Sequence, residues 1–172
     1  MSGIRSLLSL MEPPPEGGDD CDWEAIASAT GWRFPADYRE VVAVFGAGEI
    51  AGGVGFGVPP RRGESMDSGI LRSRPKRSAA LLMWGGSDVG ESYYWRCSET
   101  DPDEWTVAVA SGSGTWSDFD MGVVEFLARM LSGRLGASLA IDMSGDGHRF
   151  IGWREAEREL VAGLEADGFD HD

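Results

Sequence analysis

Several features that usually mark an enzyme, a secreted protein or a membrane protein are scarce in this sequence. Its 172 residues include two cysteines and two histidines. Cys21 and Cys97 have no C-x-x-C or other metal-ligand spacing, so we expect reduced thiols, a cytoplasmic protein and no metal site. The longest wholly apolar runs, at 41–45 and 79–84, fall far short of the roughly 20 residues that cross a bilayer. The first residues show no signal-peptide pattern.

Sequence patterns of nucleophilic and nucleotide-dependent catalysis are missing as well. A nucleophile needs a base beside it, and the sequence has no H-E-x-x-H motif, no P-loop and no G-x-S-x-G elbow. The glycines at 46–48 follow an expected helix, whereas a dinucleotide loop follows a strand, so we expect no cofactor. One enzymatic option remains open, which is acid–base hydrolysis by paired carboxylates. The candidates for it are Asp101, Asp103 and Glu104.

Basic residues are also few, and their distribution is uneven. The chain has 15 Lys and Arg against 29 Asp and Glu, a net charge of −14. Residues 1–86 hold nine basic and eleven acidic side chains, whereas 87–172 hold six and eighteen. Between 87 and 125 nine carboxylates stand against Arg96 alone. A field of this sign repels nucleic acid and anionic lipid and attracts basic partners. We therefore expect a protein partner, no nucleic acid and no membrane.

The chain divides into a short N-terminal segment and one domain. Apolar residues at helical spacing predict a short helix over 2–11, and the prolines at 13–15 end it. Residues 16–20 have the composition of a flexible acidic linker. Residues 21–172 are long enough for a single domain with its own core.

Within that domain, helices are expected at both ends of a run of strands. Asp22 is a suitable N-cap for a helix to about Thr30, and Pro35 opens a second helix that stops before Gly46. Asp120 is expected to cap a third helix. The apolar stripes of the last two helices predict buried side chains at Tyr38, Val42, Phe45, Leu127 and Leu131.

Strands are expected at 54–58, 79–84, 91–97 and 105–110, with weaker signals at 139–141 and 148–153 and a final helix at 154–166. Connections of six or seven residues favour antiparallel pairing. The expected class is α+β, an antiparallel sheet of about four to six strands flanked by helices. Trp84, Trp95 and Trp105 fall on neighbouring strands, where we expect them to be core residues rather than a stacking platform for bases or sugars.

The order of these features resembles the SMI1/KNR4, or SUKH, family. The family's opening pattern matches Gly31-Trp32-Arg33-Phe34-Pro35-Ala36-Asp37-Tyr38, followed by Phe45-Gly46-Ala47-Gly48. Its central pattern matches Trp84-Gly85-Gly86-Ser87-Asp88-Val89-Gly90, then Tyr93-Tyr94-Trp95, then Asp101-Pro102-Asp103-Glu104-Trp105-Thr106-Val107. The resemblance covers residues 22–133, and 133–172 are less typical.

The resemblance implies an α+β domain without enzymatic activity or cofactor. Many bacterial members are similar to immunity proteins that neutralise a toxin, often a nuclease, and others to adaptor or regulatory modules. Of these, we expect a toxin-neutralising immunity protein; the oligomeric state is left open. Two neighbouring turns are expected to bring the partner-binding candidates together, and these are Asp88, Glu91, Asp101, Asp103 and Glu104.

Overall fold

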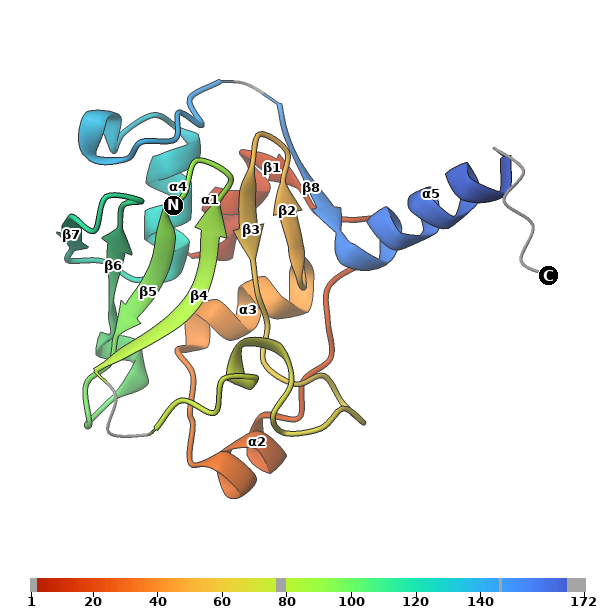
Figure 1. Cartoon of the computed structure of the whole chain (residues 1–172). Helices are drawn as coiled ribbons and strands as arrows, with labels where there is room; N and C mark the ends of the chain where they lie inside the picture. Colours follow the sequence, from red (N-terminus) through yellow and green to blue (C-terminus); the bar gives the residue numbers. More distant parts are fainter. Residues whose placement is uncertain (1–2, 77–79, 146, 167–172) are drawn as a thin grey trace.

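The computed structural model describes residues 3–76, 80–145 and 147–166 (Figure 1). Its α-helices are α1 (Ile4–Leu8), α2 (Trp23–Thr30), α3 (Ala36–Val44), α4 (Val123–Leu131) and α5 (Trp153–Ala166). Short 3-10 helices are η1 (Gly69–Leu71), η2 (Pro102–Glu104) and η3 (Gly136–Ser138). The strands are β1 (Met11–Glu12), β2 (Gly48–Ile50), β3 (Val54–Phe56), β4 (Leu81–Ser87), β5 (Ser92–Arg96), β6 (Thr106–Ala110), β7 (Trp116–Phe119) and β8 (His148–Gly152).

In the described part of the chain, these strands form one eight-stranded sheet in the order β1-β8-β2-β3-β4-β5-β6-β7. The expected α+β class is confirmed, but the expected number of four to six strands is wrong. The purely antiparallel arrangement is wrong too, because β1 pairs with β8 in parallel, Met11 lying opposite His148. These two strands are 136 residues apart in sequence, so no short connection could have indicated their pairing.

The central strands follow the expected meander. β4, β5 and β6 pair antiparallel in sequence order, with Trp95 opposite Leu82 on one side and Val107 on the other. The signals at 54–58 and 148–153 correspond to β3 and β8, and the final helix is α5. The strand expected at 139–141 is wrong. Leu139 and Ile141 are buried, but they lie in a loop after η3 and contribute to the core without joining the sheet.

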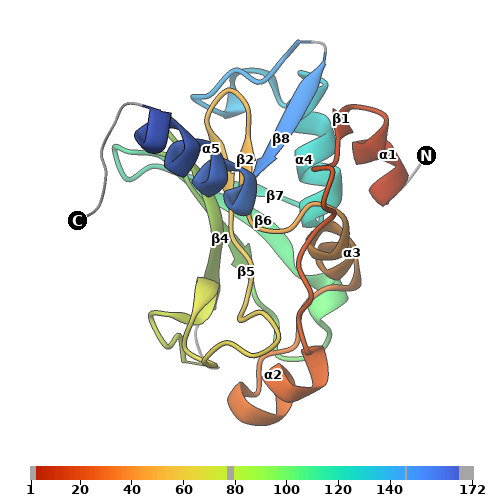
Figure 2. The same cartoon turned by 90° about the vertical axis from the view of Figure 1, so that its right-hand side faces the viewer.

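Helices α1, α3 and α4 cover one face of the sheet (Figure 2). Alternation along β5 places Tyr93 and Trp95 on this covered face, where both are fully buried. Phe126 of α4 reaches them, its ring 5.7 Å from that of Tyr93. The expected burial is confirmed for both helical stripes and for the three tryptophans, since each of these side chains is at most 2% exposed. They are Tyr38, Val42, Phe45, Leu127, Leu131, Trp84, Trp95 and Trp105.

The helix ends show one confirmed cap and one correction. Asp22 caps α2, accepting a hydrogen bond from the Ala25 N–H at 3.0 Å, and Gly31 ends the helix in a left-handed conformation with φ of 76°. Asp120, in contrast, does not cap α4. The N-cap residue is Gly122, which has no side chain to accept a hydrogen bond. The Val124 N–H near the start of α4 instead donates a hydrogen bond to the carboxylate of Asp37, which belongs to α3.

The N-terminal segment lies against the rest of the fold. The expected helix over 2–11 is shorter than predicted, because α1 ends at Leu8 and Met11 begins β1; residue 2 is outside the described residues. Leu7 and Met11 are both buried. Farther along, the segment expected to be a linker contributes the buried carboxylate of Asp19.

Candidate functional site

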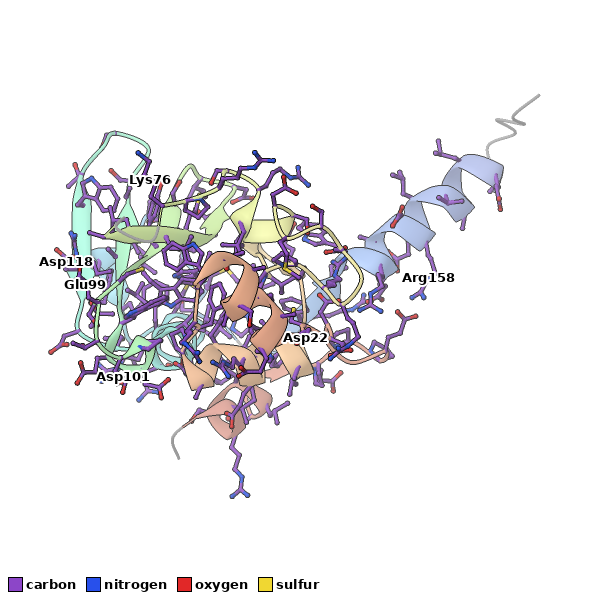
Figure 3. All side chains as sticks on the ribbon, turned by 90° about the horizontal axis from the view of Figure 1, so that it is seen from below. Asp22, Lys76, Glu99, Asp101, Asp118 and Arg158 are labelled. Carbon is purple, nitrogen blue, oxygen red and sulfur yellow. The ribbon has the colours of Figure 1, made fainter. Side chains whose placement is uncertain are left out.

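Four exposed carboxylates gather in the connection between β5 and β6, residues 99–104, which we name the acidic turn. They are Glu99, Asp101, Asp103 and Glu104. The turn holds its shape through η2, whose N-cap Asp101 accepts a hydrogen bond from the Asp103 N–H at 2.9 Å. Among the described residues, no Lys or Arg forms an ion pair with any of the four. Figure 3 shows Glu99 and Asp101 on the same side of the molecule as Asp118 of β7.

The acidic turn is fastened to the helical layer by one of its own carboxylates. Asp103 Oδ1 accepts a hydrogen bond from the Ala36 N–H, the first residue of α3, at 2.6 Å. Asp37, in the first turn of α3, in turn accepts one from the Val124 N–H near the start of α4, at 3.3 Å. Helix N-termini carry free N–H groups and partial positive charge, so both carboxylates stabilise helices to which they do not belong.

These two aspartates line a cleft of about 580 Å³ together with side chains of α1 and α4. Burial raises the pKa of Asp37; hydrogen bonds from the N–H groups of Val124 and Tyr38 oppose this, and the charges of Asp103 and Glu40 add to it. On the α4 side Glu125 and Arg129 form an ion pair at 2.6 Å. The cleft therefore presents the carboxylates of Asp37 and Asp103 on one side and, on the other, the Glu125–Arg129 ion pair of α4 together with Arg134, which follows that helix.

The structure separates the partner-binding candidates into two groups. Asp88 and Glu91 lie in the turn that precedes β5, and Asp101, Asp103 and Glu104 lie in the turn that follows it. Because β5 runs between these turns, they stand at opposite ends of the strand. The expectation that the two turns bring all five together is wrong. Asp88 is exposed, as are the three residues of the acidic turn.

Glu91 is almost completely buried. It is 4% exposed, and its carboxylate accepts hydrogen bonds from Ser87 Oγ at 3.2 Å, Tyr93 Oη at 3.1 Å and the Ala140 N–H at 2.5 Å. Burial, together with the charge of Glu91, raises the pKa of Tyr93 well above its usual range. Glu91 thus ties the loop after η3 to the sheet.

Sequence reasoning missed three acidic residues near this site: Glu99, Asp37 and Glu125. Glu99 could have been found, because it stands in the same acidic run as Asp101. Asp37 and Glu125 give no local signal, because each is an ordinary first-turn carboxylate of its own helix. Only the packing of α3 against α4 places them around one cleft.

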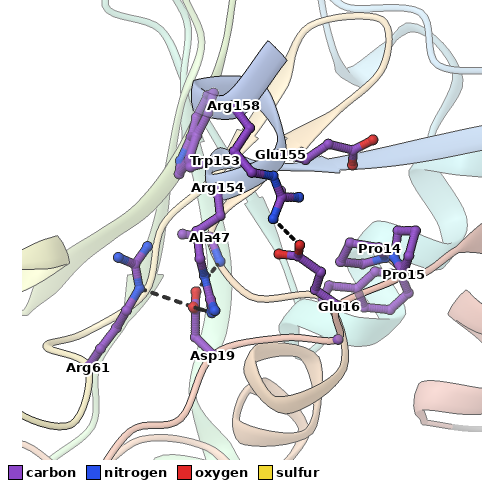
Figure 4. Close-up of a pocket in the computed structure, with 13 residues that line it drawn as sticks. Pro14, Pro15, Glu16, Asp19, Ala47, Arg61, Trp153, Arg154, Glu155 and Arg158 are labelled. Atoms are coloured by element: carbon purple, nitrogen blue, oxygen red, sulfur yellow. Dashed lines mark hydrogen bonds and ion pairs between the residues drawn. The ribbon is translucent and has the colours of Figure 1, made fainter. Parts of the chain in front are cut away.

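A second polar cluster surrounds the carboxylate of Asp19 and lies beside the first turn of α5 (Figure 4). The Asp19 carboxylate, 3% exposed, accepts hydrogen bonds from the Ala47 N–H at 2.7 Å and from the Arg154 guanidinium. Arg61 Nε lies 3.0 Å from the same carboxylate, an ion pair without hydrogen-bond alignment. Arg158 pairs with Glu16. The cluster joins the N-terminal segment, the loop after β3 and α5.

The loop after β3 is rich in arginine, yet three of its arginines are neutralised locally. Arg62 pairs with Asp20 at 2.7 Å and with Asp22 at 2.8 Å, and Arg74 pairs with Asp67 at 2.5 Å. Together with Arg61, these contacts leave the loop much less positive than its sequence indicates.

The geometry around the other reactive groups gives no catalytic arrangement within the described residues. Burial raises the pKa of the Cys21 thiol to about 12, which keeps it protonated and unreactive at neutral pH. Ser111 Oγ lies 2.9 Å from Ser113 Oγ, and His148 Nε2 lies 3.0 Å from the Leu131 carbonyl oxygen. In the same residues no three His, Cys, Asp or Glu side chains are grouped as metal ligands would be.

Comparison with known proteins found no match: no family model, no curated protein and no solved structure matches this chain. The relation to the SMI1/KNR4 family stays an expectation from the sequence motifs. No helix of the described residues is long and apolar enough to cross a membrane.

Proposed function

We propose that this chain is a protein-binding domain whose acidic turn docks on a basic surface of its partner. One observation carries the proposal: four exposed carboxylates within six residues, with no cation paired to them among the described residues. Like charges crowded in one turn repel each other, and a cationic partner relieves that repulsion. The anchor from Asp103 to α3 holds the turn in place before the partner arrives.

The partner class that suits this surface best is a nuclease-type toxin, and the chain would then be its immunity protein in the cytoplasm. A nuclease presents basic side chains to bind phosphate. A carboxylate-rich turn held on a rigid fold can occupy that surface by charge complementarity. The motif resemblance to the SMI1/KNR4 family supports this reading, since many bacterial members of that family are similar to immunity proteins.

The test is charge reversal in the acidic turn. The variant Glu99→Lys, Asp101→Lys, Glu104→Lys leaves Asp103 intact, because Asp103 holds the start of α3. We expect the association rate with the cognate toxin to fall at least tenfold, and its salt dependence to weaken. Measurements are binding kinetics over a salt series and inhibition of toxin activity, with the toxin taken from the neighbouring reading frame.

The matched control reverses three exposed carboxylates of α5, namely Glu157, Glu159 and Glu165. It changes the net charge by the same amount at the far side of the molecule (Figure 3). If the association rate falls by the same factor in both variants, the overall charge of the chain and not the acidic turn steers the partner. If the acidic-turn variant binds and protects as well as the parent, the proposed docking surface is wrong.

A carboxylate-dependent hydrolase is the second candidate, favoured by the two aspartates that share the 580 Å³ cleft. Asp37 and Asp103 both already accept helix N–H groups, which is a structural use of the carboxylates. The variants Asp37→Asn and Asp103→Asn separate the candidates. Each keeps an acceptor oxygen for the helix, so a binding protein retains its partner, whereas a hydrolase loses turnover of its substrate by several orders of magnitude.

A further inference from the structure

The face of β4–β7 opposite the helical layer, which we name the open face, carries an exposed aromatic cluster. Trp116 of β7 is 43% exposed, and its ring centroid lies 5.2 Å from that of Tyr94 on β5. The Arg96 guanidinium lies over the same indole, 5.9 Å from its centroid. Met83, 45% exposed, lies opposite Tyr94 in the register of β4 and β5. We name Tyr94, Arg96 and Trp116 the aromatic stack.

The register of the sheet places these side chains together. Side chains alternate along β5, so Tyr94 and Arg96 share the open face. Between β5 and β7, strand β6 contributes Ala108, which lies opposite Tyr94 on one side and Asp118 on the other. The small alanine side chain leaves room for the larger rings of the two neighbouring strands to meet, and Ala108 itself is fully buried.

The aromatic stack is held in place within the chain. Arg96 pairs with Asp118, which fixes the guanidinium beside the indole and balances its charge there. The side chains stand on paired strands, so a partner that contacts them has little side-chain entropy to remove. Tryptophan, tyrosine and arginine are also the residue types that most often carry the binding energy of protein interfaces.

The aromatic stack adjoins the acidic turn. Arg96 ends β5, and Glu99 follows it by three residues. Three residues of extended chain span at most about 11 Å. Figure 3 shows Glu99 and Asp101 on the same side of the molecule as Asp118, which pairs with Arg96. A partner seated on the acidic turn therefore lies within reach of the stack.

The charges around the stack favour one kind of occupant. Exposed aromatic rings can stack nucleic-acid bases, but the phosphates of a nucleic acid would then lie near the carboxylates of the acidic turn. A second copy of this chain would bring a net charge of −14 against the same carboxylates. A basic protein surface is attracted instead, and Arg96 opposes it little, because Asp118 balances its charge.

We propose that the aromatic stack and the acidic turn form one interface: the partner packs an apolar side chain against Trp116 while its Lys or Arg side chains lie on the acidic turn. This inference rests on the proposed function and specifies what the partner carries beside its basic surface. An apolar centre with a charged rim is the usual anatomy of a protein interface.

The two parts of this interface act at different stages of binding. The carboxylates of the acidic turn act at a distance and raise the association rate. Contact with the aromatic stack forms only in the complex, so the stack slows dissociation. Variants of the two parts should therefore change different rate constants.

Binding kinetics with the toxin from the neighbouring reading frame test this division. Trp116→Ala is expected to raise the dissociation rate about tenfold or more and to leave the association rate within about twofold of the parent. Trp116→Phe keeps an aromatic ring and should recover most of the lost residence time. Trp153→Ala is the matched control, because Trp153 is 45% exposed but stands at the start of α5, and it should change neither rate.

Met83→Ala is the second variant on the open face, and it keeps the aromatic stack intact. It removes an exposed side chain opposite Tyr94, so the dissociation rate should rise by about threefold to tenfold without a change in the association rate. Circular dichroism of each variant verifies the fold. If Trp116→Ala does not fold, Trp116→Phe and Met83→Ala carry the test.

Unchanged dissociation in the folded variants of the open face overturns this inference. The proposed function then stands if reversing the charges of Glu99, Asp101 and Glu104 still lowers the association rate, and it fails as well if that variant binds like the parent. Sedimentation equilibrium of the chain alone tests the rival occupant. A monomeric parent supports the inference, whereas a dimer that Trp116→Ala dissociates assigns the open face to a second copy and overturns it.

Discussion

The two turns at either end of β5 carry carboxylates that the structure uses in opposite ways. Before the strand, Glu91 is 4% exposed and accepts three hydrogen bonds, so its charge stabilises the fold. After the strand, Glu99 and Glu104 are exposed and form no ion pair within the described residues. In sequence both turns look acidic and polar, with two carboxylates before the strand and four after it. Burial and hydrogen bonding, not charge, distinguish a structural carboxylate from one free to bind a partner.

The largest difference is expected from truncating one carboxylate at each end of β5, Glu91 before the strand and Glu104 after it. Glu91→Ala leaves the Tyr93 hydroxyl and the Ala140 N–H without their acceptor, and each buried unpaired donor costs about 1–3 kcal/mol. We expect the free energy of unfolding to fall by about 2–4 kcal/mol. Glu104→Ala should change it by less than about 0.5 kcal/mol, as for other surface positions. Chemical denaturation measures both.

Glu91→Gln is the control for the first variant. Glutamine has nearly the same size as glutamate and keeps one carbonyl oxygen as acceptor. The free energy of unfolding of this variant should therefore lie between that of the parent and that of Glu91→Ala. Equal losses for Glu91→Ala and Glu104→Ala would break the comparison, because burial at Glu91 would then have no energetic consequence.

A smaller contrast is expected inside the acidic turn itself. Asp103 accepts a hydrogen bond from the Ala36 N–H at the start of α3, whereas among the described residues Glu104 accepts one only from the Thr100 hydroxyl, at 3.3 Å. Asp103→Ala should therefore destabilise the protein by about 1 kcal/mol, the usual cost of a lost helix cap. Asp103→Asn keeps the acceptor and should lose much less. If thermal unfolding shows Asp103→Ala and Glu104→Ala to be equal, the turn is not anchored through Asp103.

Much of the fold could be predicted where the signal is local. The alternation of Tyr93 and Trp95 with smaller or polar neighbours predicts a strand with one covered face, and β5 has that form. The strands that were missed are short or paired over long distances. β1 has two residues and β2 three, too few for a periodic pattern. β7 alternates correctly, but Asp118 on its open face gave it the composition of a loop.

The errors at the candidate site have the same physical origin. Asp120 has the right residue type and position for a local N-cap, but α4 takes its acceptor from Asp37, 87 residues away. Glu91 belongs to an acidic stretch, but the loop after η3 folds over it and supplies the Ala140 N–H. Local rules assign such residues by type, whereas their roles depend on which distant backbone donors come near them. The carboxylates of the acidic turn meet no such distant donor among the described residues apart from the Ala36 N–H, so their exposure could be predicted from the sequence.

The smallest expected effect concerns Asp37, which is intermediate between the two classes of carboxylate. Burial raises its pKa above the ordinary value of 3.8, so the folded protein holds this proton more tightly than the unfolded chain does. Its contribution to stability is therefore complete below pH 3.8 and is lost as the pH rises through the raised pKa of the folded state. Asp37→Asn cannot ionise and keeps an oxygen for the Val124 N–H. The free energy of unfolding of this variant should equal that of the parent below pH 3.8 and exceed it increasingly as the pH rises, which urea denaturation over a pH series measures.

Glu40→Gln is the control for this prediction. It removes one charge that raises the pKa of Asp37, so it should shift the fall in stability to lower pH without abolishing it. A parent that gains stability relative to Asp37→Asn over this pH range would show that the hydrogen bonds from Val124 and Tyr38 outweigh burial, and would place Asp37 with Glu91 among the structural carboxylates.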